Sequence, residues 1–277
     1  MALRAAARGV AFSHMHEIEA VQVVRLSAAG PRQERDHVAV EAPLEIRVDG
    51  APVTITLRTP GDDEALARGL LFAEGLIAGG GRAGPRVLAV HPQGEQGIEL
   101  HLDAPLAAGG ARRAFLATSS CGACGKDSLE ALRVDLPPVP PGFSVARAVV
   151  ASLPDRLRSA QRAFEATGGL HAAGAFDAAG QMLVVREDVG RHNAVDKVVG
   201  WAHQAGRLPF SDAILCVSGR TSYEIVQKAV CAGFPVVAAV SAPSSLAIAF
   251  AEAYGVALCG FVRAGAVTVY AHAERIG

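Results

Sequence analysis

Residues 213–261 read AILCVSGRTSYEIVQKAVCAGFPVVAAVSAPSSLAIAFAEAYGVALCGF, and this stretch decides the fold. Short apolar runs alternate in it with longer segments that have helical periodicity. The pattern predicts strands at 213–217, 235–240 and 256–261, with helices at 223–232 and 245–254 between them. Strands that alternate with helices are typical of a parallel sheet with right-handed crossovers. The sequence therefore predicts an α/β domain.

Outward from this stretch, the same reasoning predicts elements on the N-terminal side. Helices are expected at 194–205 and 65–77, with one helix or a helix pair at 145–167. Short β-type runs separated by turn residues predict further strands at 182–186, 171–175, 97–102, 86–90, 53–57, 44–48 and 21–26. The runs at 21–26, 44–48 and 53–57, which come first in the chain, indicate an antiparallel start.

A domain boundary is predicted at 137–141, where four of five residues are proline. Such a run cannot continue a helix and favours an extended connector. We therefore expect a flexible tail at 1–19, an N-terminal α+β domain at 20–136 and a C-terminal domain at 143–277, whose sheet is parallel or mixed.

The charge balance of the 277 residues bears on the partners. Lysine and arginine total 26 against 27 aspartates and glutamates, so no net positive charge attracts a polyanion. Nucleic acid is therefore not expected as a partner. The most apolar region, 234–262, is interrupted by Pro243, Glu252 and Gly255, and no membrane segment is predicted.

Five cysteines make an odd number, which argues against a disulfide scaffold and favours a reducing compartment. We expect a cytoplasmic protein. Cys216, Cys231 and Cys259 stand singly in apolar runs and are expected to be buried small hydrophobic residues. Cys121 and Cys124 instead form a pair in a segment rich in glycine and serine.

This pair, followed by Lys126, is the predicted chemical centre. An accessible thiolate can accept a sulfane sulfur, and a neighbouring thiol can release or protect it. Structural zinc would require two further ligands, and thioredoxin-like exchange would require the pair to open a helix directly after a strand. A zinc deaminase would require proline before the first cysteine, where Ser120 stands. Sulfur carriage is favoured over these alternatives.

Two loops are predicted to bind phosphate. The first contains Ser218, Gly219, Arg220, Thr221 and Ser222, and the second contains Ser241 and Ser244. Each follows a predicted strand and opens a predicted helix, whose free N–H groups favour anions. Adjacent loops at the carboxyl ends of parallel strands form the crevice in which open α/β sheets bind nucleotides.

Two further segments are assigned to the same ligand. Residues 260–265 end the next predicted strand and add a cation and flexible backbone; they are Gly260, Phe261, Val262, Arg263, Ala264 and Gly265. Residues 186–193 place five ionisable side chains before a helix, and His192 among them can transfer protons or contact the ligand. The alternative is that this charge density is only a solvated helix entrance.

The chain resembles the FdhD family of formate dehydrogenase accessory proteins. The resemblance is carried by five segments, TPGDDE at 59–64, SSCGACGK at 119–126, EDVGRHNAVDK at 187–197, SGRTS at 218–222 and GFVR at 260–263. It implies a cytidine-deaminase-like three-layer C-terminal domain and a homodimer. It also implies that Cys121 forms a persulfide, that Cys124 assists it, and that residues 260–265 contact a cofactor.

The implied activity is that of a sulfurtransferase. It would take persulfide sulfur from a cysteine desulfurase and pass it to the bis(molybdopterin guanine dinucleotide) molybdenum cofactor before insertion into apo formate dehydrogenase. GDP would be a partial mimic of that cargo. The main alternative is a non-catalytic chaperone that binds the cofactor without using the thiols. A zinc-dependent hydrolase or deaminase is the second alternative.

Overall fold

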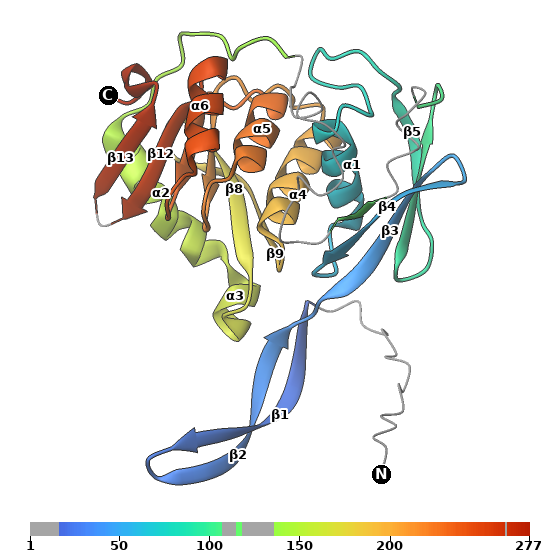
Figure 1. Ribbon diagram of the computed structural model, residues 1–277, viewed down its shortest axis with the longest axis vertical. Coiled ribbons are helices and arrows are strands. Elements are labelled where there is room, and N and C mark those ends of the chain that lie inside the picture. The colour runs from blue at the N-terminus through green and yellow to red at the C-terminus, as the bar shows by residue number, and fades with distance from the viewer. Residues whose placement is uncertain (1–16, 107–114, 118–135, 264) are drawn as a thin grey trace.

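A computed structural model describes residues 17–106, 115–117, 136–263 and 265–277 (Figure 1). Its largest element is a six-stranded mixed sheet with the strand order β13-β12-β11-β10-β8-β9. These strands are β8 (His171–Asp177), β9 (Met182–Asp188), β10 (Ala213–Val217), β11 (Val236–Ala239), β12 (Ala257–Arg263) and β13 (Ala266–Ala271). β10, β11 and β12 are parallel neighbours, whereas β8, β9 and β13 pair antiparallel. The predicted mixed α/β class is confirmed.

Helices cover both faces of this sheet, which gives three layers (Figure 1). The helices of the C-terminal half are α2 (Arg147–Ala160), α3 (Arg162–Thr167), α4 (Arg191–Gln204), α5 (Tyr223–Ala232) and α6 (Ser245–Tyr254). Ile214 and Cys216 pack in one cluster with α2, while Leu215 and Val217 pack in the other with α4, α5 and α6. Successive side chains of a strand point to opposite faces, so the apolar run of β10 serves both cores.

The N-terminal half contains a five-stranded mixed sheet with the order β5-β6-β3-β4-β7 and the helix α1 (Asp63–Ala73). Its strands are β3 (Ala42–Val48), β4 (Ala51–Arg58), β5 (Val87–Pro92), β6 (Gly97–Leu102) and β7 (Phe115–Ala117). α1 begins two residues before the predicted helix and ends at Ala73. One hydrophobic cluster contains buried residues from both halves, including Leu44 and Val198.

Two glycines allow α1 and α4 to approach closely. A Cβ atom on Gly69 would lie 1.9 Å from the carbonyl oxygen of Asp196, and one on Gly200 would lie 1.7 Å from that of Ala65. Contacts this short are impossible, so any larger residue at either position would force the helices apart. The junction of the two halves therefore depends on these glycines.

Predictions from the most periodic segments are confirmed. The strand at 213–217 and the helices at 223–232 and 245–254 have the predicted bounds. Two strands were not predicted from the sequence, β13 and β2 (Gly30–Ala39); β2 pairs with β1 (Ile18–Ser27) in a separate hairpin. β2 reads GPRQERDHVA and is mostly exposed, so it lacks the alternation of apolar and polar residues that reveals a strand.

A buried ion pair joins the two halves. Lys197 Nζ lies 2.9 Å from Asp188 Oδ2, and both side chains are at most 2% exposed. The ammonium also donates to the carbonyl of Thr59, and the backbone N–H of Thr59 donates to Asp188. Burial raises the pKa of Asp188, whereas the charge of Lys197 opposes the rise. The segment around Thr59 is thereby fixed to the start of α4.

Replacing Lys197 with Met should leave the Asp188 carboxylate buried without its counter-ion. Removing one partner of a buried ion pair costs about 3–5 kcal/mol of unfolding free energy. Urea denaturation measures this difference. Arg86→Met is the matched control, because Arg86 is 79% exposed in its pair with Asp103 and exposed pairs contribute little. Equal stability of the two variants would contradict the prediction.

Candidate functional site

Three loops meet at one edge of the six-stranded sheet, because β10, β11 and β12 are parallel neighbours. The backbone N–H of Thr221 donates to the carbonyl of Ala242, at 3.2 Å, and the N–H of Ser244 donates to the carbonyl of Thr221, at 3.0 Å. The N–H of Phe261 donates to the carbonyl of Ser241, at 3.2 Å. The predicted meeting of these loops is confirmed.

The third loop has an unusual backbone. A Cβ on Gly260 would lie 2.9 Å from the Tyr270 ring and 3.2 Å from the carbonyl oxygen of Ser241, so this position requires glycine. Phe261 has φ of 49° and is 39% exposed, and Gly265 has φ of 79°. Ala264 lies outside the described residues. The loop thus turns sharply beside Ser241 and presents an aromatic ring to solvent.

The serines at the helix starts have other partners. Ser244 Oγ accepts a hydrogen bond from the N–H of Ala247 at 3.2 Å, so it caps α6. Ser222 is the N-cap residue of α5, and its Oγ lies 3.2 Å from Nε2 of His192. The same ring nitrogen lies 2.9 Å from Glu224 Oε2. His192 is therefore next to the first loop, whereas the Ser244 hydroxyl is occupied by its own helix.

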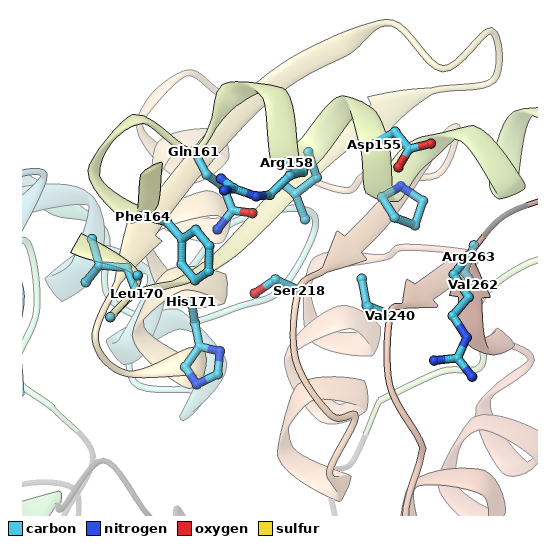
Figure 2. Close-up of a pocket in the computed structure, with 14 residues that line it drawn as sticks. Asp155, Arg158, Gln161, Phe164, Leu170, His171, Ser218, Val240, Val262 and Arg263 are labelled. Carbon is cyan, nitrogen blue, oxygen red and sulfur yellow. The ribbon is translucent and has the colours of Figure 1, made fainter. Parts of the chain in front are cut away.

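A pocket of about 540 Å³ lies at this edge, on the side covered by α2 and α3 (Figure 2). Its volume is in the range of small-molecule sites. Three predicted residues line it, namely Ser218, Val262 and Arg263. The remaining lining comes from α2, α3, the segment before β8 and the end of β11; it consists of Pro154, Asp155, Leu157, Arg158, Gln161, Phe164, Gly168, Gly169, Leu170, His171 and Val240.

The pocket offers an aromatic ring and polar side chains to a ligand. Gln161 lines the pocket and is only 4% exposed. The Phe164 ring lies beside it, with Arg158 Cζ 4.4 Å from the ring centroid. Figure 2 shows Gln161, Phe164 and Ser218 around one space, with Arg263 at its far end. An aromatic, hydrogen-bonding ligand with negative charge fits this lining.

The acidic segment before α4 positions the aromatic wall. The two carboxylate oxygens of Glu187 accept hydrogen bonds from the N–H groups of Ala163 and Phe164, at 2.9 and 2.8 Å. The carboxylate thereby caps the start of α3, where negative charge is favoured. Glu187 is the residue before Asp188, so the buried ion pair and the pocket wall are connected through one strand end.

The pocket edge is electropositive. Burial lowers the pKa of His171, and the nearby charges of Arg191 and His192 lower it further. Arg220 acts on His171 in the same direction; it is exposed, and none of the described residues pairs with it. The charge of Asp188 acts on His171 in the opposite direction, but the three cationic side chains outnumber it and favour an anionic ligand at this end.

Cys121 and Cys124 lie outside the described residues, so their predicted role stays a prediction. The other three cysteines are confirmed as buried. Burial raises the pKa of Cys259 to about 12 and raises that of Cys216 still more. Such thiols stay protonated and inaccessible at neutral pH, which makes them poor nucleophiles.

Sequence reasoning missed the wall formed by Arg158, Gln161 and Phe164. No local pattern indicated it, because the helix is broken at Gln161, between the end of α2 at Ala160 and the start of α3 at Arg162. His171 gave no signal either. It was predicted only as the first residue of a strand, and the antiparallel pairing of β8 with β10 brings it beside Ser218.

The comparisons with known proteins agree with this architecture. The model of the FdhD/NarQ family matches residues 39–277. The chain belongs to the FdhD/NarQ family. The match includes the cysteine pair, the three loops and the pocket wall.

Curated relatives of this FdhD/NarQ chain cover most of its length. The "Sulfur carrier protein FdhD" of Mycolicibacterium paratuberculosis is 51% identical over 267 residues, which cover 92% of this chain and 97% of the relative. The protein of the same name from Anaeromyxobacter dehalogenans strain 2CP-C is 49% identical and covers 88% of this chain and 89% of its own length.

A solved structure supports the fold. The crystal structure of a putative formate dehydrogenase accessory protein from Desulfotalea psychrophila superposes with a TM-score of 0.78. It covers 95% of this chain and 100% of its own, at 23% identity. Among the described helices, none has the length and apolar character needed to cross a membrane. The described residues also contain no cluster of three or more His, Cys, Asp or Glu that could hold a metal ion.

The pocket histidine should titrate below its ordinary range. We expect an NMR titration to give His171 a pKa below about 6.5, because burial and neighbouring cations disfavour its charged form. His272 is the internal contrast, since its hydrogen bonds to the Glu252 carbonyl and to Glu274 raise its pKa. A His171 midpoint above that of His272 would contradict the prediction.

The lowered pKa of His171 also predicts how the free energy of unfolding depends on pH. The unfolded chain binds more protons at His171 than the folded chain below about pH 6.5, so the free energy of unfolding falls as the pH drops toward the folded pKa. His171→Gln should therefore lose less stability than wild type between pH 7.5 and pH 5.5 in urea denaturation.

Proposed function

We propose that this protein is a sulfur carrier for formate dehydrogenase maturation. The observation that carries the proposal is 51% identity, over 92% of the chain, to a protein named sulfur carrier protein FdhD. The burial of Cys216, Cys231 and Cys259 supports it. The carrier would then be the Cys121 and Cys124 pair, and the reducing cytoplasm is the compartment in which free thiols persist.

The transfer begins on Cys121. Its thiolate attacks the terminal sulfur of a persulfide on a cysteine desulfurase, and the desulfurase cysteine leaves as a thiolate. The product is a persulfide on Cys121, with no change in the number of electrons. Releasing the sulfur as hydrosulfide requires two electrons. Cys124 supplies them when its thiolate attacks Cys121 and forms a disulfide, which a cellular dithiol then reduces.

The cargo proposed for the pocket is the bis(molybdopterin guanine dinucleotide) cofactor, with GDP as a partial mimic. A nucleobase can stack on Phe164 and hydrogen-bond to the side-chain amide of Gln161, both of which line the pocket. Arg220 and Arg263 flank the same sheet edge and can pair with a diphosphate. Apo formate dehydrogenase would receive the sulfurated cofactor.

Cys121→Ala should abolish sulfur carriage. We expect intact-mass analysis after incubation with a cysteine desulfurase and cysteine to show a gain of one sulfur in wild type and none in the variant. Cys124→Ala should still gain the sulfur and release it more slowly. A non-catalytic chaperone predicts instead that Cys121→Ala activates formate dehydrogenase as well as wild type does. A persulfide mapped mainly to Cys216, Cys231 or Cys259 would also contradict the proposal.

Pocket variants should weaken nucleotide binding while leaving sulfur acceptance intact. Phe164→Ala should cost about 1–3 kcal/mol of GDP binding through lost stacking, and Arg220→Ala about 1.5–3 kcal/mol through a lost charge-assisted hydrogen bond. Isothermal calorimetry measures both, with the exposed Arg86→Ala as control. Unchanged GDP affinity in both pocket variants would refute the placement of the nucleotide. Persulfide formation on Cys121 should be normal in each.

A further inference from the structure

The helix α3 lies between the pocket and the hairpin of β1 and β2 (Figure 1). Its residue Phe164 lines the pocket, and Arg158 of α2 lies over the Phe164 ring. The contacts of α3 with other helices and strands are mainly with β2 and β1. Just after α3, a Cβ on Gly169 would lie 3.6 Å from the Cβ of Ala39, the last residue of β2. One short helix therefore contacts both the ligand space and the base of the hairpin.

Both ends of α3 have a backbone geometry that interrupts a helix. Gln161, between α2 and α3, has φ of −82° and ψ of 77°, which lies outside the helical region. Gly168, directly after α3, has φ of 67° in the left-handed region that glycine adopts without steric cost. Residues at the ends of an element that absorb changes in φ and ψ are typical hinges. α3 can therefore rotate as a unit while α2 and β8 keep their conformation.

Glu187 fixes α3 to the six-stranded sheet. Its carboxylate accepts the hydrogen bonds from the first N–H groups of α3 that are described above. Glu187 itself belongs to β9 and pairs with Ala172 of β8. Its backbone carbonyl also accepts a hydrogen bond from Lys197 Nζ, at 3.2 Å. The acceptor is thus anchored in the sheet, whereas the N–H groups that it holds belong to α3.

The hairpin depends on α3 for support. Neither β1 nor β2 pairs with another of the described strands. An isolated two-stranded hairpin is marginally stable in water. Val24 and Leu26 toward the tip are 58% and 79% exposed, so this part of the hairpin gains little from burial. The order of the hairpin base therefore depends on its packing against α3.

We propose that α3 is a movable wall that couples the hairpin to the pocket. In the closed state Glu187 holds the first N–H groups of α3, Phe164 completes the pocket, and the hairpin base packs on α3. In the open state these N–H groups face water, Phe164 swings away from the ligand, and the hairpin base loses its support. The ligand itself is the nucleotide cargo, and for that identity the inference rests on the proposed function.

The coupling acts in both directions. A ligand that stacks on Phe164 favours the closed state, so it also orders the hairpin base. A contact that moves the hairpin away from α3 favours the open state and weakens ligand binding by the same factor. Displacing the hairpin is therefore a way to release the cargo from the pocket.

Hydrogen exchange of the full-length chain measures the closed state without any ligand. Glu187→Gln leaves one acceptor oxygen for two N–H donors, so the amides of residues 162–168 should exchange on the order of tenfold faster. The hairpin base, residues 17–20 and 37–40, should also exchange faster. Glu165→Gln is the matched control, because Glu165 is exposed on α3, and it should change neither segment. Urea denaturation establishes that both variants are folded.

A bulky residue at the hairpin base tests the coupling from the other side. Ala39→Phe should push the hairpin away from Gly169 and α3, so that residues 162–168 exchange faster. It should also weaken GDP binding by about tenfold, which is a usual size of coupling between two sites. Leu26→Phe introduces the same residue near the exposed tip of the same hairpin and should change neither quantity. Isothermal calorimetry measures the GDP affinity.

GDP is the probe for the reverse direction. In the wild-type chain, saturating GDP should slow exchange both in residues 162–168 and in the hairpin base. In Phe164→Ala, which lacks the stacking ring, GDP at the same concentration should not slow exchange in the hairpin base.

Three results would overturn the proposal. One is GDP binding to the wild-type chain with no change of exchange in the hairpin base. Another is an Ala39→Phe variant that matches Leu26→Phe in both exchange and GDP affinity. The third is a Glu187→Gln variant in which neither segment exchanges faster. If the wild-type chain binds no GDP, the proposed cargo is wrong, and the exchange rates of Glu187→Gln and Ala39→Phe alone decide whether α3 couples to the hairpin.

Discussion

The buried contact between Asp188 and Lys197 is the constraint on which the other features of the molecule depend. Two opposite charges that are almost fully removed from water are stable only when each is hydrogen-bonded. Here the further partners are Thr59, Gly190 and Asn193. Thr59 belongs to the N-terminal half and the others belong to the start of α4. The ion pair therefore determines how the two halves fit together.

The buried ion pair also affects the pocket, through Glu187, the residue before Asp188. Glu187 caps α3 with both carboxylate oxygens, and α3 carries Phe164 into the pocket lining. A change that moved Asp188 would shift the end of β9 and with it this cap. The cluster of acidic and basic residues at 186–193 thus contributes mainly to positioning. Its dense charge resembles a solvated helix entrance in the sequence, yet Asp188 has no exposed surface and Asn193 is 6% exposed.

Sequence reasoning recovered the part of the fold in which local pattern and tertiary structure agree. The strand at 213–217 is apolar throughout and buried on both faces, and a short run of this kind is typical of a central strand. The meeting of the loops at Ser218, Ser241 and Gly260 followed from the order of parallel strands. β2 and the pocket wall were missed because their side chains are mixed in polarity. The approach of Phe164 to Ser218 depends on antiparallel β8 and on a bend at Gln161, which no local pattern specifies.

The proposed sulfur carriage and the proposed nucleotide binding would make different demands on the chain. A persulfide carrier must meet a desulfurase and then a cofactor, so its thiols need access to both. A nucleotide pocket requires the opposite, because stacking and hydrogen bonds to Gln161 gain strength from burial and fixed geometry. The cysteine pair stands in a segment of the sequence rich in glycine and serine, whereas the pocket lies between packed helices and a sheet edge. Under the proposed function, the two tasks would therefore fall to different segments of the sequence, and the pocket could keep a fixed geometry while the cysteine segment meets its partners.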